Sequence, residues 1–122
     1  KSREVNNIKR EWVLEQIKSH SNKIKTSLKR DIKIGIFGIT YKQNTDDLRE
    51  SPALKITLDL INSGYDVLVC EPNILEYKQL KFSSLNEVKE SCDLLVFLIR
   101  HTEFLDLNLE NTNYLDFCNL NN

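Results

Sequence analysis

Charged side chains gather in one short segment, residues 42–49, which holds Lys42, Asp46, Asp47 and Arg49. Lysine and arginine bind phosphate groups through charge-assisted hydrogen bonds, and the arginine fork can make two of them at once. We interpret the two aspartates as carboxylates that orient these cations, rather than as a general acid and base. The residue types therefore indicate either an anion-binding loop or a surface loop with solvated charges, and they do not decide between the two.

A short apolar run precedes this segment and must position it. Residues 32–37 read Ile-Lys-Ile-Gly-Ile-Phe and end at Gly38, a pattern that predicts a buried strand. Ser51 and Pro52 then begin a helix, with serine as the N-cap and proline in the first turn. The loop 38–50 between them exceeds the roughly two to six residues usual at such a connection, and loops of this length are often functional.

The rest of the chain alternates between apolar strands and helices. Strands that are apolar throughout and alternate with helices predict a parallel sheet covered on both faces, with right-handed crossovers. We therefore predict an α/β fold, a Rossmann-like parallel sheet flanked by helices and preceded by a long N-terminal helix. The further predicted elements are a strand over 66–70, a helix from a capping box at 84–87 through Cys92, a strand over 93–99 and a strand over 114–117.

Three segments follow predicted strands and are expected to converge, because ligands of open parallel sheets bind at the carboxyl ends of the strands. They are the loop 38–50, the turn Glu-Pro-Asn at 71–73 and Arg-His-Thr at 100–102. We interpret His101 as a hydrogen-bonded group behind the ligand, not as a catalytic one. The glycines read Gly35-x-x-Gly38, which is not the G-x-G-x-x-G fingerprint of a dinucleotide site, so this half should not hold NAD.

The N-terminal segment has helical spacing and carries most of the positive charge. A helix is predicted from about Glu4 to Leu28, with Ser-His-Ser-Asn at 19–22 as a candidate interruption. Its apolar stripe requires a partner surface. We predict residues 1–30 as a long connecting helix and residues 31–122 as the Rossmann-like domain. The predicted stripe consists of Val5, Ile8, Trp12, Ile17, Ile24 and Leu28.

Composition limits the function classes. The 122 residues are 40% apolar and 29% charged, which predicts one folded domain. The net charge of −1 divides into +6 over residues 1–30 and −7 over residues 31–122. Trp12 is the only aromatic residue in the basic part, so we expect a solvated helix face there and no nucleic-acid partner. No apolar run approaches the roughly 20 residues of a membrane span, so we expect no membrane partner and a cytoplasmic location.

The three cysteines indicate neither a disulfide framework nor a zinc site. Cys70, Cys92 and Cys118 are odd in number and widely spaced, without a second ligand at metal-binding distance in the sequence. We interpret each as a small buried apolar residue. No metal site is therefore predicted.

Residues 38–53 read Gly-Ile-Thr-Tyr-Lys-Gln-Asn-Thr-Asp-Asp-Leu-Arg-Glu-Ser-Pro-Ala. This run resembles the signature G-x-x-[FY]-K-x-x-T-D-D-x-R-E-S-P-A, which opens the C-terminal domain of the UDP-glucose and UDP-N-acetylmannosamine dehydrogenase family. The similarity continues in residues 69–73, 100–104 and 115–119, and residues 3–6 are similar to the Arg-x-x-Asn start of the family's long central helix. The resemblance covers essentially the whole chain.

The resemblance implies the UDP-sugar-binding domain of an NAD-dependent UDP-sugar 6-dehydrogenase, a homodimer through the N-terminal helix. It implies that Tyr41 and Lys42 bind the UDP-sugar, and that Arg49 reaches toward NAD held mainly on another domain. It implies no catalytic residue in this chain, because the family's NAD fingerprint and nucleophilic cysteine precede the central helix and Cys118 lacks the surrounding glycines. One departure is Asp-Phe-Cys at 116–118, where some relatives have Asp-Gly-Arg; a nucleotide contact from this end stays open.

The sequence leaves more than one substrate and more than one class of protein open. Val-Cys-Glu-Pro-Asn at 69–73 resembles the branch that oxidises UDP-N-acetyl-D-mannosamine for surface polysaccharides, and UDP-glucose or UDP-N-acetylglucosamine stay open. A non-enzymatic regulatory module, such as a receiver, should have an acidic pair straight after its first strand, where this chain has Phe37, Gly38 and Ile39. An interaction module using the basic helix should bind nucleic acid in a salt-sensitive way.

Overall fold

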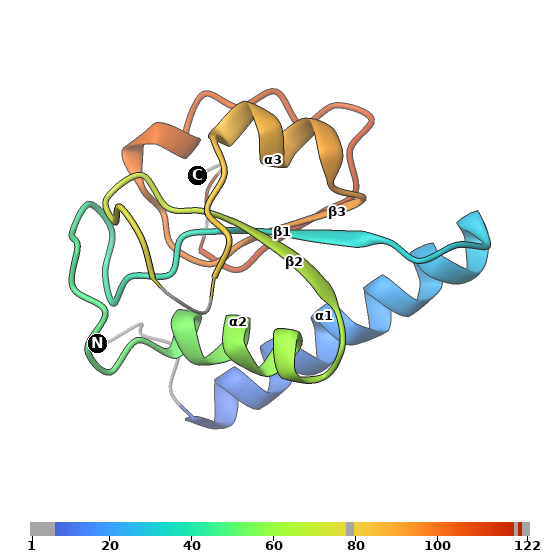
Figure 1. The fold of residues 1–122 in the computed structure, drawn as a ribbon, viewed down its shortest axis with the longest axis horizontal. Coiled ribbons are helices and arrows are strands. Elements are labelled where there is room, and N and C mark those ends of the chain that lie inside the picture. The colour runs from blue at the N-terminus through green and yellow to red at the C-terminus, as the bar shows by residue number, and fades with distance from the viewer. Residues whose placement is uncertain (1–6, 78–79, 119, 121–122) are drawn as a thin grey trace.

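The computed structural model describes residues 7–77, 80–118 and 120. The chain folds into helices and strands in the predicted alternation (Figure 1). In chain order the elements are α1 (Asn7–Leu28), β1 (Lys33–Phe37), α2 (Pro52–Asn62), β2 (Asp66–Cys70), α3 (Leu85–Ser91), β3 (Leu94–Phe97), the 3-10 helix η1 (Thr102–Phe104) and β4 (Tyr114–Asp116).

The four strands form one parallel sheet in the order β2-β1-β3-β4. Ile36 of the central strand β1 lies opposite Val69 on one side and Val96 on the other. This confirms the predicted Rossmann-like sheet. The third strand is shorter than the predicted 93–99, because the amides of Leu98 and Ile99 both point to the carbonyl of Phe37, at 3.0 and 3.4 Å, and the chain turns away there.

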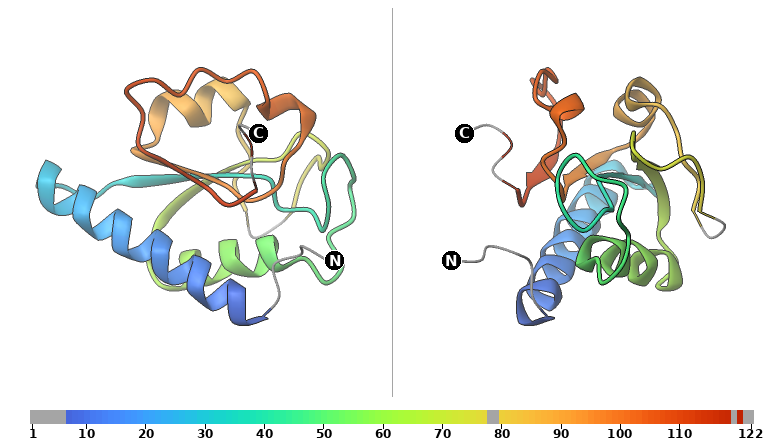
Figure 2. Two further views of the ribbon diagram at one scale, coloured as in Figure 1. Left: turned by 180° about the vertical axis from the view of Figure 1, so that it is seen from behind. Right: turned by 90° about the vertical axis from the view of Figure 1, so that its left-hand side faces the viewer.

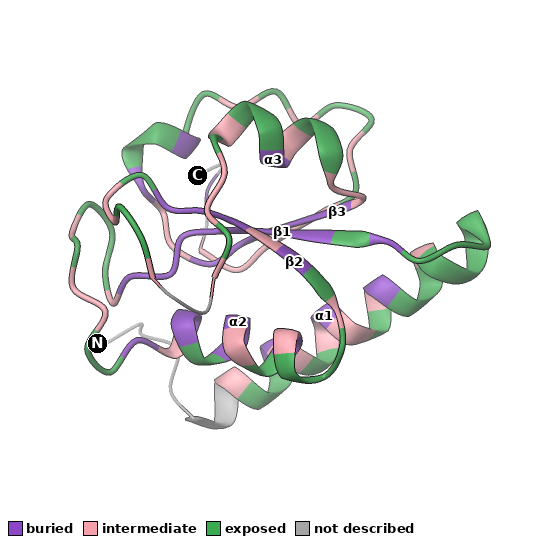
Figure 3. Cartoon of the chain, in the orientation of Figure 1, coloured by how far each residue is buried: buried purple, intermediate pink, exposed green. Residues whose placement is uncertain are grey.

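Helices cover both faces of the sheet. Figures 1 and 2 show α1 and α2 on one face and α3 on the other. Because side chains alternate along a strand, Ile34 and Ile36 of β1 join the core under α1 and α2, whereas Phe37 joins the core under α3. Figure 3 shows β1, β2 and β3 as mostly buried. Gly35 allows α3 to approach, since a Cβ there would lie 2.5 Å from Cγ1 of Val88.

The helix α1 packs on its own domain more closely than predicted. Val13 and Ile17 are fully buried and belong to the same core as β1 and α2. Ile17 of the predicted stripe therefore finds its partner surface within the domain, whereas Trp12 is 50% exposed and Leu28 is 46% exposed. The helix runs through 19–22 without interruption, because Ser21 is small enough to be buried in the packed face.

Two predictions about the N-terminal segment concern residues outside the described ranges. The predicted helix start at Glu4 and the residues 3–6 of the family resemblance lie outside them. Over the residues that the structure does describe, no helix is both long and apolar enough to cross a membrane.

Candidate functional site

The three segments that follow β1, β2 and β3 meet at one edge of the sheet, as predicted. They lie on the left in Figure 1, and the right-hand view of Figure 2 looks onto them. Gly38 begins the first segment with a φ of +96°, and its amide donates to the carbonyl of Cys70 over 3.1 Å. A Cβ at this position would lie 2.6 Å from Cβ of Ile99. Glycine is therefore required both by the left-handed backbone and by the close approach of the third segment.

The buried carboxylate of Glu71 joins these segments. Its Oε1 accepts the amide of Ile39 at 2.8 Å, and its Oε2 accepts the amide of Asn73 at 3.1 Å. Nε2 of His101 lies 3.0 Å from both oxygens. A buried charge is stable only when it is paired and hydrogen-bonded, and these three donors meet that condition. Glu71 thus fixes the segments after β1, β2 and β3 relative to one another.

The fully buried His101 has a defined protonation state. Its Nδ1 lies 2.7 Å from the backbone nitrogen of Asn44. A backbone amide can only donate, so Nδ1 accepts and carries no proton. The imidazole is therefore neutral, with its proton on Nε2 facing Glu71. The interpretation of His101 as a hydrogen-bonded group behind the site fits this geometry, because both ring nitrogens are already engaged.

Hydrogen bonds within the chain shape the long loop after β1. The hydroxyl of Thr40 donates to the carbonyl of Lys42 at 2.7 Å, and the amide of Tyr41 donates to the carbonyl of Asp47 at 2.7 Å. At the far end of the loop, Ser51 caps α2 as predicted: its hydroxyl accepts the amide of Leu54 and donates to the carbonyl of Ile39. These hydrogen bonds thus hold the loop in a defined conformation.

The predicted ligand-binding side chains lie on the outside of this loop. Lys42 is exposed, with its ammonium 5.8 Å from the centre of the half-buried Tyr41 ring. Arg49 is 89% exposed and pairs with Asp47, from Nε at 3.1 Å and from Nη2 at 3.2 Å. These hydrogen bonds raise the pKa of Arg49 and lower that of Asp47. Asp47 therefore orients a cation as predicted, while the same role for the exposed Asp46 stays a prediction.

The cysteines have no nucleophilic character. Burial raises the pKa of Cys70 and of Cys118 to about 12, and that of Cys92 to about 11. Only the thiolate attacks, so these thiols stay inert near neutral pH. Cys92 and Cys118 are only partly buried, which corrects the interpretation of all three as buried residues. Within 7–77, 80–118 and 120, no group of three histidine, cysteine or acidic side chains could hold a metal ion.

Gly35 and Gly38 leave no room for a dinucleotide to approach the backbone. A Cβ at Gly35 would meet Val88, and a Cβ at Gly38 would meet Ile99. The space beside these two glycines is thus filled by the chain's own packing, so a pyrophosphate could not approach the backbone there. Gly35 and Gly38 therefore do not form a dinucleotide site.

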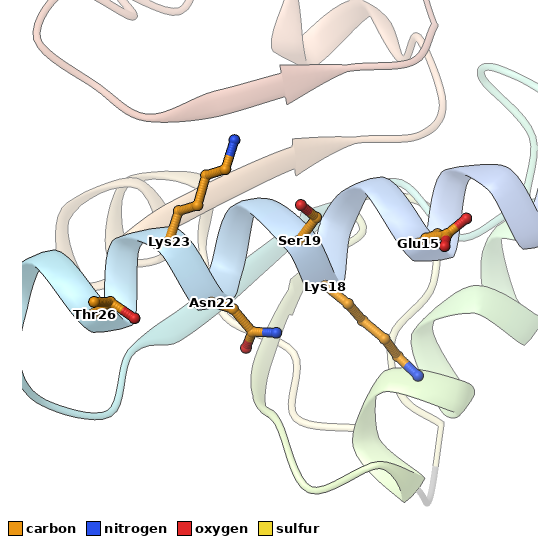
Figure 4. A pocket seen from close by; sticks show the side chains of 6 residues that line it. All are labelled: Glu15, Lys18, Ser19, Asn22, Lys23 and Thr26. Carbon is orange, nitrogen blue, oxygen red and sulfur yellow. The ribbon is translucent and has the colours of Figure 1, made fainter.

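Among the described residues, two surface hollows are of interest, and neither is a complete ligand pocket. One, of about 220 Å³, adjoins the converging segments and is below the roughly 300–1,000 Å³ of a typical small-molecule site. Figure 4 shows the other on the outer face of α1, where a single helix supplies every lining side chain, from Glu15 to Thr26. The first is lined by Cys70, Glu71, Pro72, Ser83, Ser84, Leu85 and Glu103. A large ligand at the loop would therefore extend beyond this hollow.

Sequence reasoning missed the role of Glu71. It placed the residue in a strand-ending turn but gave it no partner, and Asn44 and Asn73 were not singled out. A usable signal is the position of Glu71 directly after an apolar strand, where a carboxylate is buried and must find donors.

Fold and site together define a Rossmann-like α/β domain with a polar loop at the carboxyl ends of its strands. Comparison with known proteins assigns its family. Residues 35–117 match the UDP binding domain of the UDP-glucose/GDP-mannose dehydrogenase family, and the chain belongs to this family.

Individual relatives agree with this assignment. The chain is 40% identical to UDP-N-acetyl-D-mannosamine dehydrogenase of Escherichia coli K12, over 90% of the chain and 28% of that protein. It is also 40% identical to the protein of that name from Methanocaldococcus jannaschii, over 72% of the chain and 21% of the relative. The solved structure of UDP-N-acetyl-mannosamine dehydrogenase from Staphylococcus aureus superposes with a TM-score of 0.74 at 23% identity, over 95% of the chain and 32% of that structure, which shows the same fold. The chain thus spans about a quarter of these relatives.

Proposed function

We propose that the chain binds the UDP part of a UDP-sugar at the loop 38–50. The observation that carries this proposal is the exposed ammonium of Lys42, presented by a hydrogen-bonded loop at the carboxyl ends of parallel strands. Ligands of such sheets bind at this edge, and a diphosphate is complementary to a lysine ammonium. The match to a UDP binding domain supports the same ligand.

The three predicted site residues divide the work. Lys42 makes a charge-assisted contact to the UDP-sugar, and the neighbouring Tyr41 ring limits where the lysine can extend. Arg49 lies further along the loop and is held by Asp47 with its guanidinium exposed, so it serves NAD bound on another domain. The tests of Lys42 and Arg49 are given in the Discussion.

The whole protein is proposed to oxidise the C6 alcohol of its UDP-sugar to a carboxylate, with NAD as the oxidant. UDP-N-acetyl-D-mannosamine is the proposed substrate, since two relatives that are 40% identical to the chain are named for its dehydrogenase. The product would serve surface polysaccharide synthesis in the cytoplasm. In this arrangement residues 1–30 connect the UDP-sugar domain, residues 31–122, to the remainder of the enzyme.

The location of the site can be tested by nuclear magnetic resonance of the ¹⁵N-labelled chain. Addition of UDP should shift the amides of residues 38–50, 71–73 and 100–102, while those at the amino ends of the strands stay in place. Shifts confined to α1 would place the ligand in the hollow of Figure 4 and would refute the loop assignment.

The chain by itself is expected to have no dehydrogenase activity. Its cysteine thiols are held protonated, and Gly35 and Gly38 leave no space for a dinucleotide beside the backbone. Incubation with NAD and UDP-N-acetyl-D-mannosamine should produce no absorbance of NADH at 340 nm. Steady NADH production by the purified chain would contradict the division of labour proposed here.

We also propose that the chain self-associates through α1. Trp12 is half exposed and contacts Phe117 edge to face at 5.9 Å, so together they offer an apolar surface. The variant Trp12→Glu should shift sedimentation toward the monomer, because association would bury its charge. The control Asn62→Glu adds the same charge on the exposed end of α2 and should not. A wild-type chain that is already monomeric at high concentration would end this proposal.

A further inference from the structure

The position of Lys42 depends on its backbone. Its side chain is exposed, and its ammonium lies 5.8 Å from the centre of the Tyr41 ring. A flexible lysine on a mobile loop would lose much of its binding energy to the entropy of being ordered. What holds the backbone on either side of Lys42 therefore sets how well its ammonium is presented.

A buried imidazole holds the backbone after Lys42. The amide of Asn44 donates to Nδ1 of His101 over 2.7 Å. Asn44 has a φ of +56°, in the left-handed region that costs a non-glycine residue energy. Its side chain closes the arrangement, since Oδ1 of Asn44 accepts the amide of Thr102 at 3.0 Å. The turn at residue 44 is thus maintained by contacts to the segment after β3.

The same imidazole also contacts the side chain of Thr40, which precedes Lys42. Nε2 of His101 lies 3.2 Å from the hydroxyl of Thr40. That hydroxyl gives its own proton to the carbonyl of Lys42, so its lone pairs are free to face Nε2. The Nε2 proton is shared between Thr40 and Glu71, and the Nδ1 lone pair receives Asn44. Only the neutral ring with its proton on Nε2 satisfies all of these partners.

We propose that His101 is a positioning residue for the UDP-sugar site, which acts by holding the amide of Asn44 so that the loop presents Lys42 to the diphosphate. This inference rests on the proposed function of the loop. It separates two tasks of one ring. Nδ1 serves ligand affinity through Asn44, whereas Nε2 serves chiefly stability through Glu71, since Thr40 donates to the Lys42 carbonyl without help from the ring.

Two conservative variants distinguish these tasks. The amide end of asparagine reaches the place of Nδ1, and the amide end of glutamine reaches the place of Nε2. His101→Gln should keep a donor for Glu71 and lose the acceptor for Asn44, so its affinity for UDP-N-acetyl-D-mannosamine should fall by about fivefold, as expected for one lost hydrogen bond. His101→Asn should keep the acceptor and lose the donor, so it should bind more tightly than His101→Gln but unfold at a lower temperature.

A purely structural role predicts the reverse order of affinity, because the less stable His101→Asn variant would then be the poorer binder. Calorimetric titration of the chain at a temperature where both variants are folded by circular dichroism decides between the two orders. Equal affinities of both variants and the wild type would also overturn the proposal.

A double-mutant cycle tests whether His101 acts through Lys42. In the Lys42→Ala background, His101→Gln should cause no further loss of affinity, since the cation that the loop presents is already absent. Additive losses would refute this inference and leave the assignment of Lys42 intact. If Lys42→Ala alone leaves the affinity unchanged, the proposed function of the loop fails, and the inference fails with it.

Discussion

The variant Glu71→Leu should lose most of the stability of the chain. It removes the acceptor of two buried donors, the amide of Ile39 and the Nε2 proton of His101, and of the partly buried amide of Asn73. Each buried donor left unpaired costs about 1–3 kcal/mol, so the free energy of unfolding should fall by about 3 kcal/mol or more. Urea denaturation followed by circular dichroism measures this change.

A matched control lies five residues further along the chain. Glu76 is exposed, so Glu76→Leu removes the same charge without stranding any buried donor, and its effect should stay within about 0.5 kcal/mol. If Glu71→Leu were as stable as Glu76→Leu, the three segments would not be held together by the carboxylate.

The variant Lys42→Ala should weaken the binding of UDP-N-acetyl-D-mannosamine by about tenfold or more. A hydrogen bond to a charged group contributes about 1.5–3 kcal/mol, and the lysine is proposed to make one to the diphosphate. The fold should survive, because the side chain is exposed. Lys33→Ala is the control, since it removes the same charge from an exposed site at the amino end of β1, away from the ligand edge. Equal affinity of the two variants would show that Lys42 is not a ligand.

Arg49→Ala should behave differently in the whole enzyme. Its guanidinium is exposed and is held by Asp47 at the end of the same loop, so its removal should weaken NAD binding while UDP-sugar affinity changes little. Titration of each ligand into the whole enzyme separates the two effects. A loss of UDP-sugar affinity as large as that of Lys42→Ala would assign both cations to one ligand.

Most of the fold could be predicted because its signals are local. The apolar runs of β1, β2 and β3, the serine caps at Ser51 and Ser84 and the alternation of strands and helices each depend on neighbouring residues. The carboxyl ends of parallel strands share an edge, so the convergence of the three loops also followed. The family resemblance placed Lys42 and Arg49 on that edge, although their roles await the tests above.

The missed features depend on contacts between distant residues. Nothing in the local sequence pairs Glu71 with His101, because their contact forms only after β1, β2 and β3 are aligned. The tautomer of His101 likewise follows from the amide of Asn44, a residue without a pattern of its own. The packing of Ile17 could not be predicted for a similar reason, since helical spacing identifies an apolar stripe but not the surface that covers it.

The two alternative functions, a receiver-like module and a nucleic-acid-binding module, are not equally compatible with these findings. Family membership excludes the receiver-like module. In addition, the space beside Gly38 is filled by Ile99 and not by an acidic pocket. Nucleic-acid binding through the basic helix α1 predicts a ligand preference opposite to that of a UDP-sugar site. One binding experiment can therefore distinguish the two functions.

Calorimetric titration of the chain with UDP-N-acetyl-D-mannosamine, NAD and a single-stranded oligonucleotide tests the central claim most directly. We predict saturable binding of the UDP-sugar, displacement by UDP, and no measurable binding of NAD or the oligonucleotide. Salt-sensitive binding of the oligonucleotide without any affinity for UDP or the UDP-sugar would contradict the account.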